Sequence, residues 1–103
     1  MDDSSFQENV DEVFLEIEDR VDELSDDIDV DSSGGVLTLT FPDGSSVILS
    51  RQISIHEIWI AAKSGGFHLA FDEQVWSCAS TGEELKSLLD RVFVEQGASS
   101  PFS

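Results

Sequence analysis

Basic residues, cysteine and long apolar runs are all scarce in this sequence, and each scarcity excludes a class of function. Five Lys and Arg residues stand against 22 Asp and Glu, which gives a formal net charge of −17 at pH 7. Nucleic acids and anionic membranes are bound mainly through Lys and Arg, so neither is an expected partner. Basic proteins and cations remain.

The single cysteine, Cys78, has no second cysteine for an internal disulfide, a redox CxxC motif or a zinc site. No apolar run approaches the roughly 20 residues that span a bilayer. The opening Met-Asp-Asp-Ser-Ser has neither the basic region nor the apolar core of a signal peptide. We therefore expect a cytoplasmic protein whose 103 residues form one domain, residues 1–103.

Acidic residues are concentrated at the start of the chain, where fourteen carboxylates precede residue 32 and Arg20 is the only base. Apolar residues recur among them at helical spacing: Phe6, Val10, Val13, Phe14, Ile17, Val21 and Leu24. This stripe predicts a helix that packs on a core and displays its carboxylates outward. Ser5 and Glu8 form a capping-box pattern, so we expect the helix to run from about residue 5 to residue 24 or 25.

The middle of the chain has the two-residue alternation of strands. We expect strands over 27–31, 36–41, 47–52, 55–63, 67–71 and 75–77, with turns at 33–35, 42–45 and 64–66. A second capping-box pattern, Thr81 with Glu84, opens a closing helix that stops at Gly97, and the tail over 98–103 is expected to fray. No helix separates the strands to make a parallel crossover. The predicted fold is therefore α+β, a two-layer α/β sandwich with the N- and C-terminal helices on one face of a five- to six-stranded antiparallel sheet.

The first candidate site is an acidic ridge of eight residues: Glu18, Asp19, Asp22, Glu23, Asp26, Asp27, Asp29 and Asp31. Within it Glu18 with Asp22, Asp19 with Glu23, and Asp22 with Asp26 are i, i+4 pairs of like charge, which repel on a helix. A multivalent cation or a basic protein surface relieves such repulsion. The alternative is a solvated face that only aids solubility.

Metal sites on this ridge would contain oxygen ligands alone, so we expect weak and unselective binding. Iron as Fe²⁺ or Fe³⁺ fits, and so do Co²⁺, Mn²⁺, Ca²⁺ and lanthanides. The spacing of Asp27, Asp29 and Asp31 resembles the start of an EF-hand loop. Ser32 and Thr38 stand where that loop needs Gly and Glu, so an EF-hand is not expected.

The second candidate site is Trp59 on the open face of the sheet. Ile58 and Ile60 alternate toward the helix-covered core, which places Trp59 on the uncovered side. An exposed Trp on a polar sheet is a typical binding hot spot, and we expect Gln52 and Thr40 nearby as hydrogen-bonding residues. The alternative is a Trp half covered by its neighbours for stability alone.

We expect no further site from the remaining candidates. His56 and His68 lie apart in the sequence, with His68 facing solvent, and Trp76 is expected to pack at the sheet edge. No nucleophile elbow, P-loop or dinucleotide-binding pattern is present, so we do not expect an enzyme.

Three sequence stretches resemble the sheet of the frataxin family, in particular its bacterial branch. They are Ser-Arg-Gln at 50–52, Glu-Ile-Trp-Ile-Ala at 57–61 and Ser-Gly-Gly-Phe-His at 64–68. The likeness extends over almost the whole chain, from the acidic first helix to the closing helix. Two positions depart from it: Ser50 replaces a common Asn, and Gln7 replaces a His of some bacterial relatives, which removes one nitrogen ligand.

The resemblance implies a frataxin-like fold and an iron-binding accessory or regulator of iron–sulfur cluster assembly. Its implied partners are a cysteine desulfurase, met by the ridge residues Glu18, Asp19 and Asp22, and an iron–sulfur scaffold protein, met by Gln52 and Trp59. We expect a monomer and leave metal-dependent oligomerisation open. The competing hypothesis is an acidic inhibitor that docks on a basic protein and binds metal only incidentally.

Overall fold

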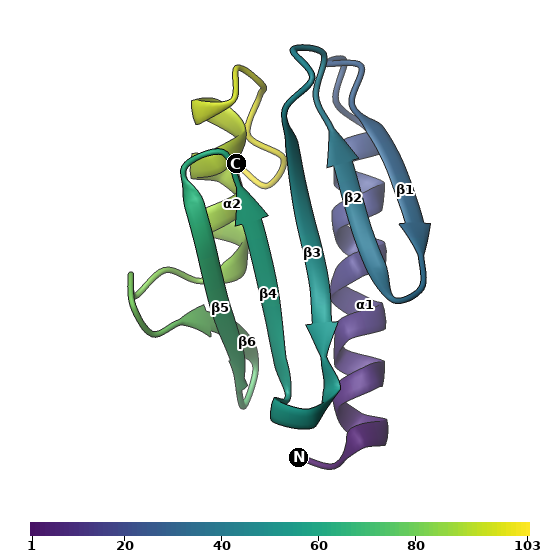
Figure 1. Cartoon of the computed structure of the whole chain (residues 1–103), viewed down its shortest axis with the longest axis vertical. Coiled ribbons are helices and arrows are strands. Elements are labelled where there is room, and N and C mark those ends of the chain that lie inside the picture. The colour runs from purple at the N-terminus through teal and green to yellow at the C-terminus, as the bar shows by residue number, and fades with distance from the viewer.

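The chain folds into two layers, an antiparallel sheet and two helices that lie together behind it (Figure 1). A computed structural model describes all residues, Met1–Ser103. The elements are α1 (Asp3–Asp22), β1 (Asp29–Ser33), β2 (Val36–Thr40), β3 (Ser46–Gln52), a 3₁₀ turn η1 (Ile53–Ile55), β4 (Glu57–Ala62), β5 (Gly65–Asp72), β6 (Val75–Cys78) and α2 (Leu85–Glu95). The six strands pair in sequence order, which confirms the predicted α+β sandwich. Neither helix has the length and apolar character needed to cross a membrane.

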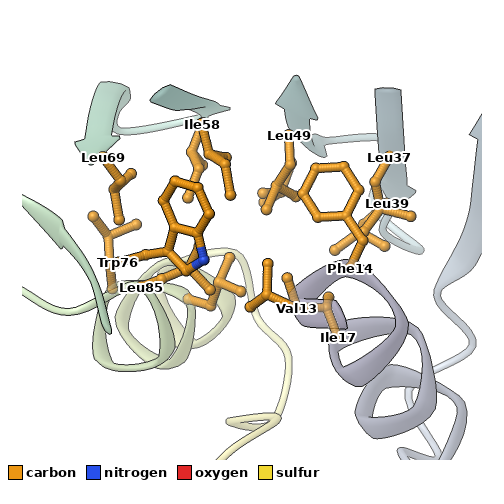
Figure 2. Packing of buried hydrophobic residues seen from close by; sticks show 14 of the residues in the cluster. Val13, Phe14, Ile17, Leu37, Leu39, Leu49, Ile58, Leu69, Trp76 and Leu85 are labelled. Carbon is orange, nitrogen blue, oxygen red and sulfur yellow. The ribbon is translucent and has the colours of Figure 1, made fainter. Parts of the chain in front are cut away.

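One hydrophobic cluster of 21 buried residues joins the two layers. Alternate strand residues point from the sheet into this cluster: Leu37, Leu39 and Leu49 lie over the α1 residues Val13, Phe14 and Ile17, and Ile58 and Leu69 lie over Trp76 and Leu85 (Figure 2). The predicted apolar stripe of α1 is buried from Phe6 to Val21. The helix therefore holds its carboxylates on a rigid support, because its other face is fixed in the core.

Both capping-box predictions are wrong. The N-cap of α1 is Asp2, whose carboxylate accepts the N–H of Ser5 at 2.7 Å, and this hydrogen bond lowers the pKa of Asp2. At α2 the Thr81 hydroxyl accepts the N–H of Glu83 at 3.2 Å, and the helix begins only at Leu85. At α1 the Asp2 carboxylate takes the place expected of Ser5. At α2 the Thr81 hydroxyl binds a residue before the helix, whose N-cap Glu84 makes no side-chain capping bond.

Strand boundaries shift at two non-glycine residues with positive φ. Asp27 has φ 54°, so β1 begins at Asp29 instead of residue 27. His56 has φ 52° and ends η1, so β4 begins at Glu57 instead of residue 55. Left-handed conformations at such residues are uncommon and are not visible in a two-residue alternation.

The C-terminal tail is packed, contrary to the expectation that it frays. Phe102 lies between two cations, 5.4 Å from the Cζ of Arg20 and 5.5 Å from the Nζ of Lys86. Its N–H donates to the carboxylate of Asp90 at 2.8 Å, and Pro101 is buried. These contacts anchor the end of the chain across both helices.

Candidate functional site

The acidic ridge begins on the C-terminal part of α1, crosses the loop that holds Asp26 and Asp27, and continues into β1. The ion pairs of the structure are made by Arg51, Lys86 and Arg91, and His56 makes one further contact with a carboxylate. All the partners are carboxylates outside the ridge: Asp11, Glu16, Glu83, Glu95 and, for His56, Asp3. None of the eight predicted ridge residues is paired with a base. Two of them accept hydrogen bonds from neutral groups, Asp26 from the N–H of Ser99 at 3.2 Å and Asp31 from the hydroxyl of Ser33 at 3.3 Å. The ridge therefore keeps its negative charge uncompensated.

The position of the ridge on α1 makes this charge more unfavourable. The helix ends at Asp22 and its C-cap is Glu23. The exposed carboxylates of Asp19, Asp22 and Glu23 therefore lie at the negative end of the helix dipole. The only base in the last turn is Arg20, which lies over the ring of Phe102. A cation bound here meets both the carboxylates and the negative end of the helix.

One of the three predicted repulsive pairs does not form on the helix. Glu18 with Asp22 lies within α1, and Asp19 with the C-cap Glu23 completes its last turn. Asp26 lies four residues beyond the end of α1, so its predicted helical pairing with Asp22 is wrong.

The two strand residues of the ridge, Asp29 and Asp31, do not continue the surface that the α1 carboxylates form. Asp29 pairs with Thr40 and Asp31 with Thr38, whereas the alternate residues Leu37 and Leu39 are fully buried against the helices. Asp29 and Asp31 therefore project on the open face of the sheet. The structure divides the predicted ridge into a helix part and a sheet part.

Metal binding on the ridge can only be shallow. No group of three or more His, Cys, Asp or Glu residues is placed to hold one ion. One or two carboxylates with water completing the shell are what the ridge offers, and exposed oxygen ligands of this kind suit hard cations. The chemistry of this donor set fits a hard cation such as iron.

Trp59 lies on the open face as predicted, since Ile58 and Ile60 on either side are buried. Its indole stacks on the imidazole of His68, with ring centroids 4.4 Å apart and 11° between the planes. Its Nε1 donates to Glu57 Oε1 at 2.8 Å. These contacts leave the Trp59 side chain half-buried and hold it in one orientation, so the aromatic surface on this face is preformed.

Gln52 lies on the same face, whereas Thr40 does not lie near Trp59. Gln52 pairs with Glu57 across the sheet, and its Nε2 donates to the hydroxyl of Ser50 at 3.3 Å. Thr40 pairs with Ser46, four residues along β3 from Ser50, which is the residue opposite Trp59. The expectation that Thr40 supplies a hydrogen bond beside Trp59 is therefore wrong.

His68 and Ser50 complete this surface, and sequence reasoning gave neither a role in it. The β4–β5 hairpin closes with Ala62 opposite Gly65, and this register sets Trp59 opposite His68. A two-residue turn at Lys63 and Ser64 implies the register that sets Trp59 opposite His68. The sequence pattern predicts the turn over 64–66 instead, and that register does not place these two residues opposite each other.

The remaining residues of interest have structural contacts. Arg51 donates from Nη1 to Gln7 at 2.6 Å and to Asp11 at 2.9 Å, so it ties β3 to α1. His56 contacts Asp3 at 2.7 Å and stacks on Phe6. Burial raises the pKa of the Cys78 thiol, but hydrogen bonds with Ser80 and Thr81 outweigh it and bring the pKa to about 7.

Comparison with known proteins identifies the family. The model of the Frataxin-like domain matches residues 1–99 of the chain. The chain belongs to the frataxin family. Frataxin relatives named iron-sulfur cluster assembly protein CyaY include one from Stutzerimonas stutzeri, 49% identical over 94 residues, which cover 89% of this chain and 86% of the relative. Another, from Pseudomonas aeruginosa, is 42% identical and is matched over 94% of this chain and 92% of its own length.

Solved frataxin structures have the same fold. Frataxin from Psychromonas ingrahamii superposes with a TM-score of 0.92 at 29% identity, and the match covers 100% of this chain and 99% of that one. Trimeric frataxin from the yeast Saccharomyces cerevisiae, complexed with ferrous iron, gives a TM-score of 0.69 at 26% identity over 88% of this chain and 82% of that chain. The bacterial frataxins are thus similar in both sequence and structure to this chain.

Proposed function

We propose that this chain is a non-catalytic, iron-binding accessory protein of iron–sulfur cluster assembly. The observation that carries the proposal is the acidic ridge, eight carboxylates without a basic partner at the end of α1, in the loop after it and on β1. The names of the CyaY relatives and the ferrous complex of the yeast protein support it.

The ridge and the Trp59 surface serve different partners in this proposal. Glu18, Asp19 and Asp22 attract a basic patch on the cysteine desulfurase, because uncompensated like charge accelerates association with a surface of opposite sign. Gln52 and Trp59 contact the scaffold protein, since a fixed, half-exposed aromatic ring on a polar sheet is typical of a hot spot. Iron at the ridge lowers the negative charge and so changes the contact with the desulfurase.

A charge-reversal experiment tests the desulfurase contact. Lys at positions 18, 19 and 22 should abolish association with the desulfurase, whereas a control with Lys at Glu8, Asp72 and Glu73 changes the net charge equally and should retain it. The control positions are exposed and take no part in an ion pair. Equal loss in both variants would show that net charge alone, and not the ridge, drives the association.

Iron dependence is tested by backbone amide signals and desulfurase rates measured under anaerobic conditions. Fe²⁺ should shift the amides of 18–31 and alter the desulfurase rate at concentrations where Mg²⁺ does neither. If Mg²⁺ acts in the same way at the same concentration, the effect is charge screening, and the chain is an acidic inhibitor with incidental metal binding.

A further inference from the structure

A groove with an apolar floor lies on the helix side of the molecule, on the opposite side of the sheet from Trp59. Its lining residue Glu16 is one turn of α1 before Asp19 of the ridge, and the groove uses none of the eight ridge residues. It has a volume of about 260 Å³ and runs between α1, the β5–β6 hairpin and the start of α2. Phe71, Val75 and Trp76 form much of its floor and wall, and Val75 is 38% exposed. This volume is slightly below the roughly 300 to 1,000 Å³ of pockets for drug-sized ligands, so it suits one or two side chains.

The rim of the groove is negatively charged. Glu12 and Glu84 line it and have no basic partner, whereas Glu16 is neutralised by Lys86, whose Nζ lies 2.9 Å from its carboxylate. An anionic ligand would be repelled by the two free carboxylates. A second copy of the chain is equally unsuitable, because each copy has a net charge of −17.

Trp76 supplies an unused hydrogen-bond donor in the groove. Its side chain is 5% exposed and packs against Phe6 and Phe71, with ring centroids 5.8 Å and 5.1 Å away (Figure 2 shows its place between the layers). The indole N–H of Trp76 makes no hydrogen bond within the protein. It is not fully buried either, because every fully buried side-chain nitrogen or oxygen of the protein has a hydrogen-bond partner. The N–H therefore keeps some access to solvent, and Trp76 itself lines the groove. Buried Trp N–H groups usually have an acceptor.

We propose that this groove binds a short, extended segment of a basic protein partner. One apolar side chain of the segment contacts Phe71 and Val75, and a backbone carbonyl accepts the indole N–H of Trp76. Lys or Arg residues beside the apolar side chain pair with Glu12 and Glu84. The proposal is independent of the proposed function, because it uses neither the ridge nor the Trp59 surface.

The test uses three capped tripeptides, Lys-Leu-Lys, Lys-Ala-Lys and Glu-Leu-Glu, titrated into the isotopically labelled full chain. Lys-Leu-Lys should shift the indole N–H signal of Trp76 and the amides of 74–76, with the Trp59 indole unchanged. The other two peptides should have less effect at equal concentration. Equal shifts with Lys-Ala-Lys, equal shifts with Glu-Leu-Glu, or no Trp76 shift up to about 10 mM Lys-Leu-Lys would each overturn the proposal.

Variants locate the binding. Glu12→Gln with Glu84→Gln should weaken Lys-Leu-Lys binding about threefold to tenfold, and Val75→Ser should weaken it without unfolding the chain, because Val75 is already exposed in part. Asp19→Asn with Glu23→Gln removes the same charge from the ridge and should leave the binding unchanged. If the ridge variant loses binding and the rim variant retains it, the peptide binds the ridge, and the groove proposal fails while the proposed function stands.

Concentration dependence separates a peptide site from self-association. Shifts of the Trp76 indole on dilution of the free protein would show that a second copy occupies the groove, and would overturn the proposal. We expect these signals to be independent of protein concentration.

Discussion

Neutralising the end of α1 should stabilise the metal-free protein. Asp19, Asp22 and Glu23 are exposed, have no basic partner and lie at the negative end of the helix dipole. Each charge in such a position costs about 0.3 to 1 kcal/mol at low ionic strength. The repulsions of Asp19 with Glu23 and of Glu18 with Asp22 each add about 0.2 to 0.5 kcal/mol. Because all three are well solvated, we take the lower part of the sum, about 1 to 2 kcal/mol.

This gain corresponds to a melting temperature about 4 to 15 °C higher for a domain of this size. The variant Asp19→Asn, Asp22→Asn, Glu23→Gln should show it in thermal unfolding followed by circular dichroism in low salt. The gain should shrink in about 1 M salt, which screens exposed charges. Fe²⁺, added anaerobically, should raise the melting temperature of the wild type more than that of the variant, because the cation binds the folded ridge and relieves the same repulsion.

The matched control is Glu8→Gln, Asp72→Asn, Glu73→Gln, which removes three exposed, unpaired charges elsewhere. It should gain little, because Glu8 lies near the positive end of α1 and the other two lie outside any helix. Equal gains in both variants would assign the effect to net charge. An undiminished response to Fe²⁺ in the ridge variant would remove the ridge as the metal site.

Three further predictions follow from the contacts of single residues. Arg51→Met should lower the free energy of unfolding by about 2 to 4 kcal/mol, because the hydrogen bonds to Gln7, Asp11 and Gly35 are lost. Urea denaturation measures this change, and an unchanged urea midpoint of unfolding would contradict it. Trp59→Ala should weaken scaffold binding by about 1 to 2 kcal/mol in calorimetry while the fold persists, and unfolding instead would make Trp59 a core residue. The Arg91 guanidinium lowers the pKa of Glu83, so this pair stabilises the fold at neutral pH, and its contribution is lost as pH falls through the lowered pKa. Glu83→Gln should therefore make the melting temperature depend less on pH on the acid side. An unaltered slope of melting temperature against pH would contradict this.

The sequence predicted the architecture because burial and alternation are periodic. The stripe of α1 and the alternation of Leu37 with Leu39, or of Ile58 with Ile60, follow from which face meets the core. These patterns suffice for two helices on one face of an antiparallel sheet. The acidic ridge was equally visible, since charge is a property of composition.

Local geometry was predicted less well, because it depends on competing hydrogen bonds. Asp2 caps α1 in place of Ser5, and the left-handed residues Asp27 and His56 move the ends of β1 and β4. Such choices differ by about 1 kcal/mol, which a periodic pattern does not resolve. The packed tail was missed for a related reason, since Phe102 is held by cations that are distant in the sequence, Arg20 and Lys86.

By itself the sequence determined the layers, the core face of each strand and the net negative charge of the N-terminal third. Only the tertiary structure decided which groups meet: Trp59 with His68 across the sheet, and Glu12 with Glu84 around the groove that Trp76 lines. Asp29 and Asp31 were separated in the same way from the helix carboxylates beside them in the sequence. The physical reason is that burial and charge belong to individual residues, whereas strand register and helix placement bring distant residues together.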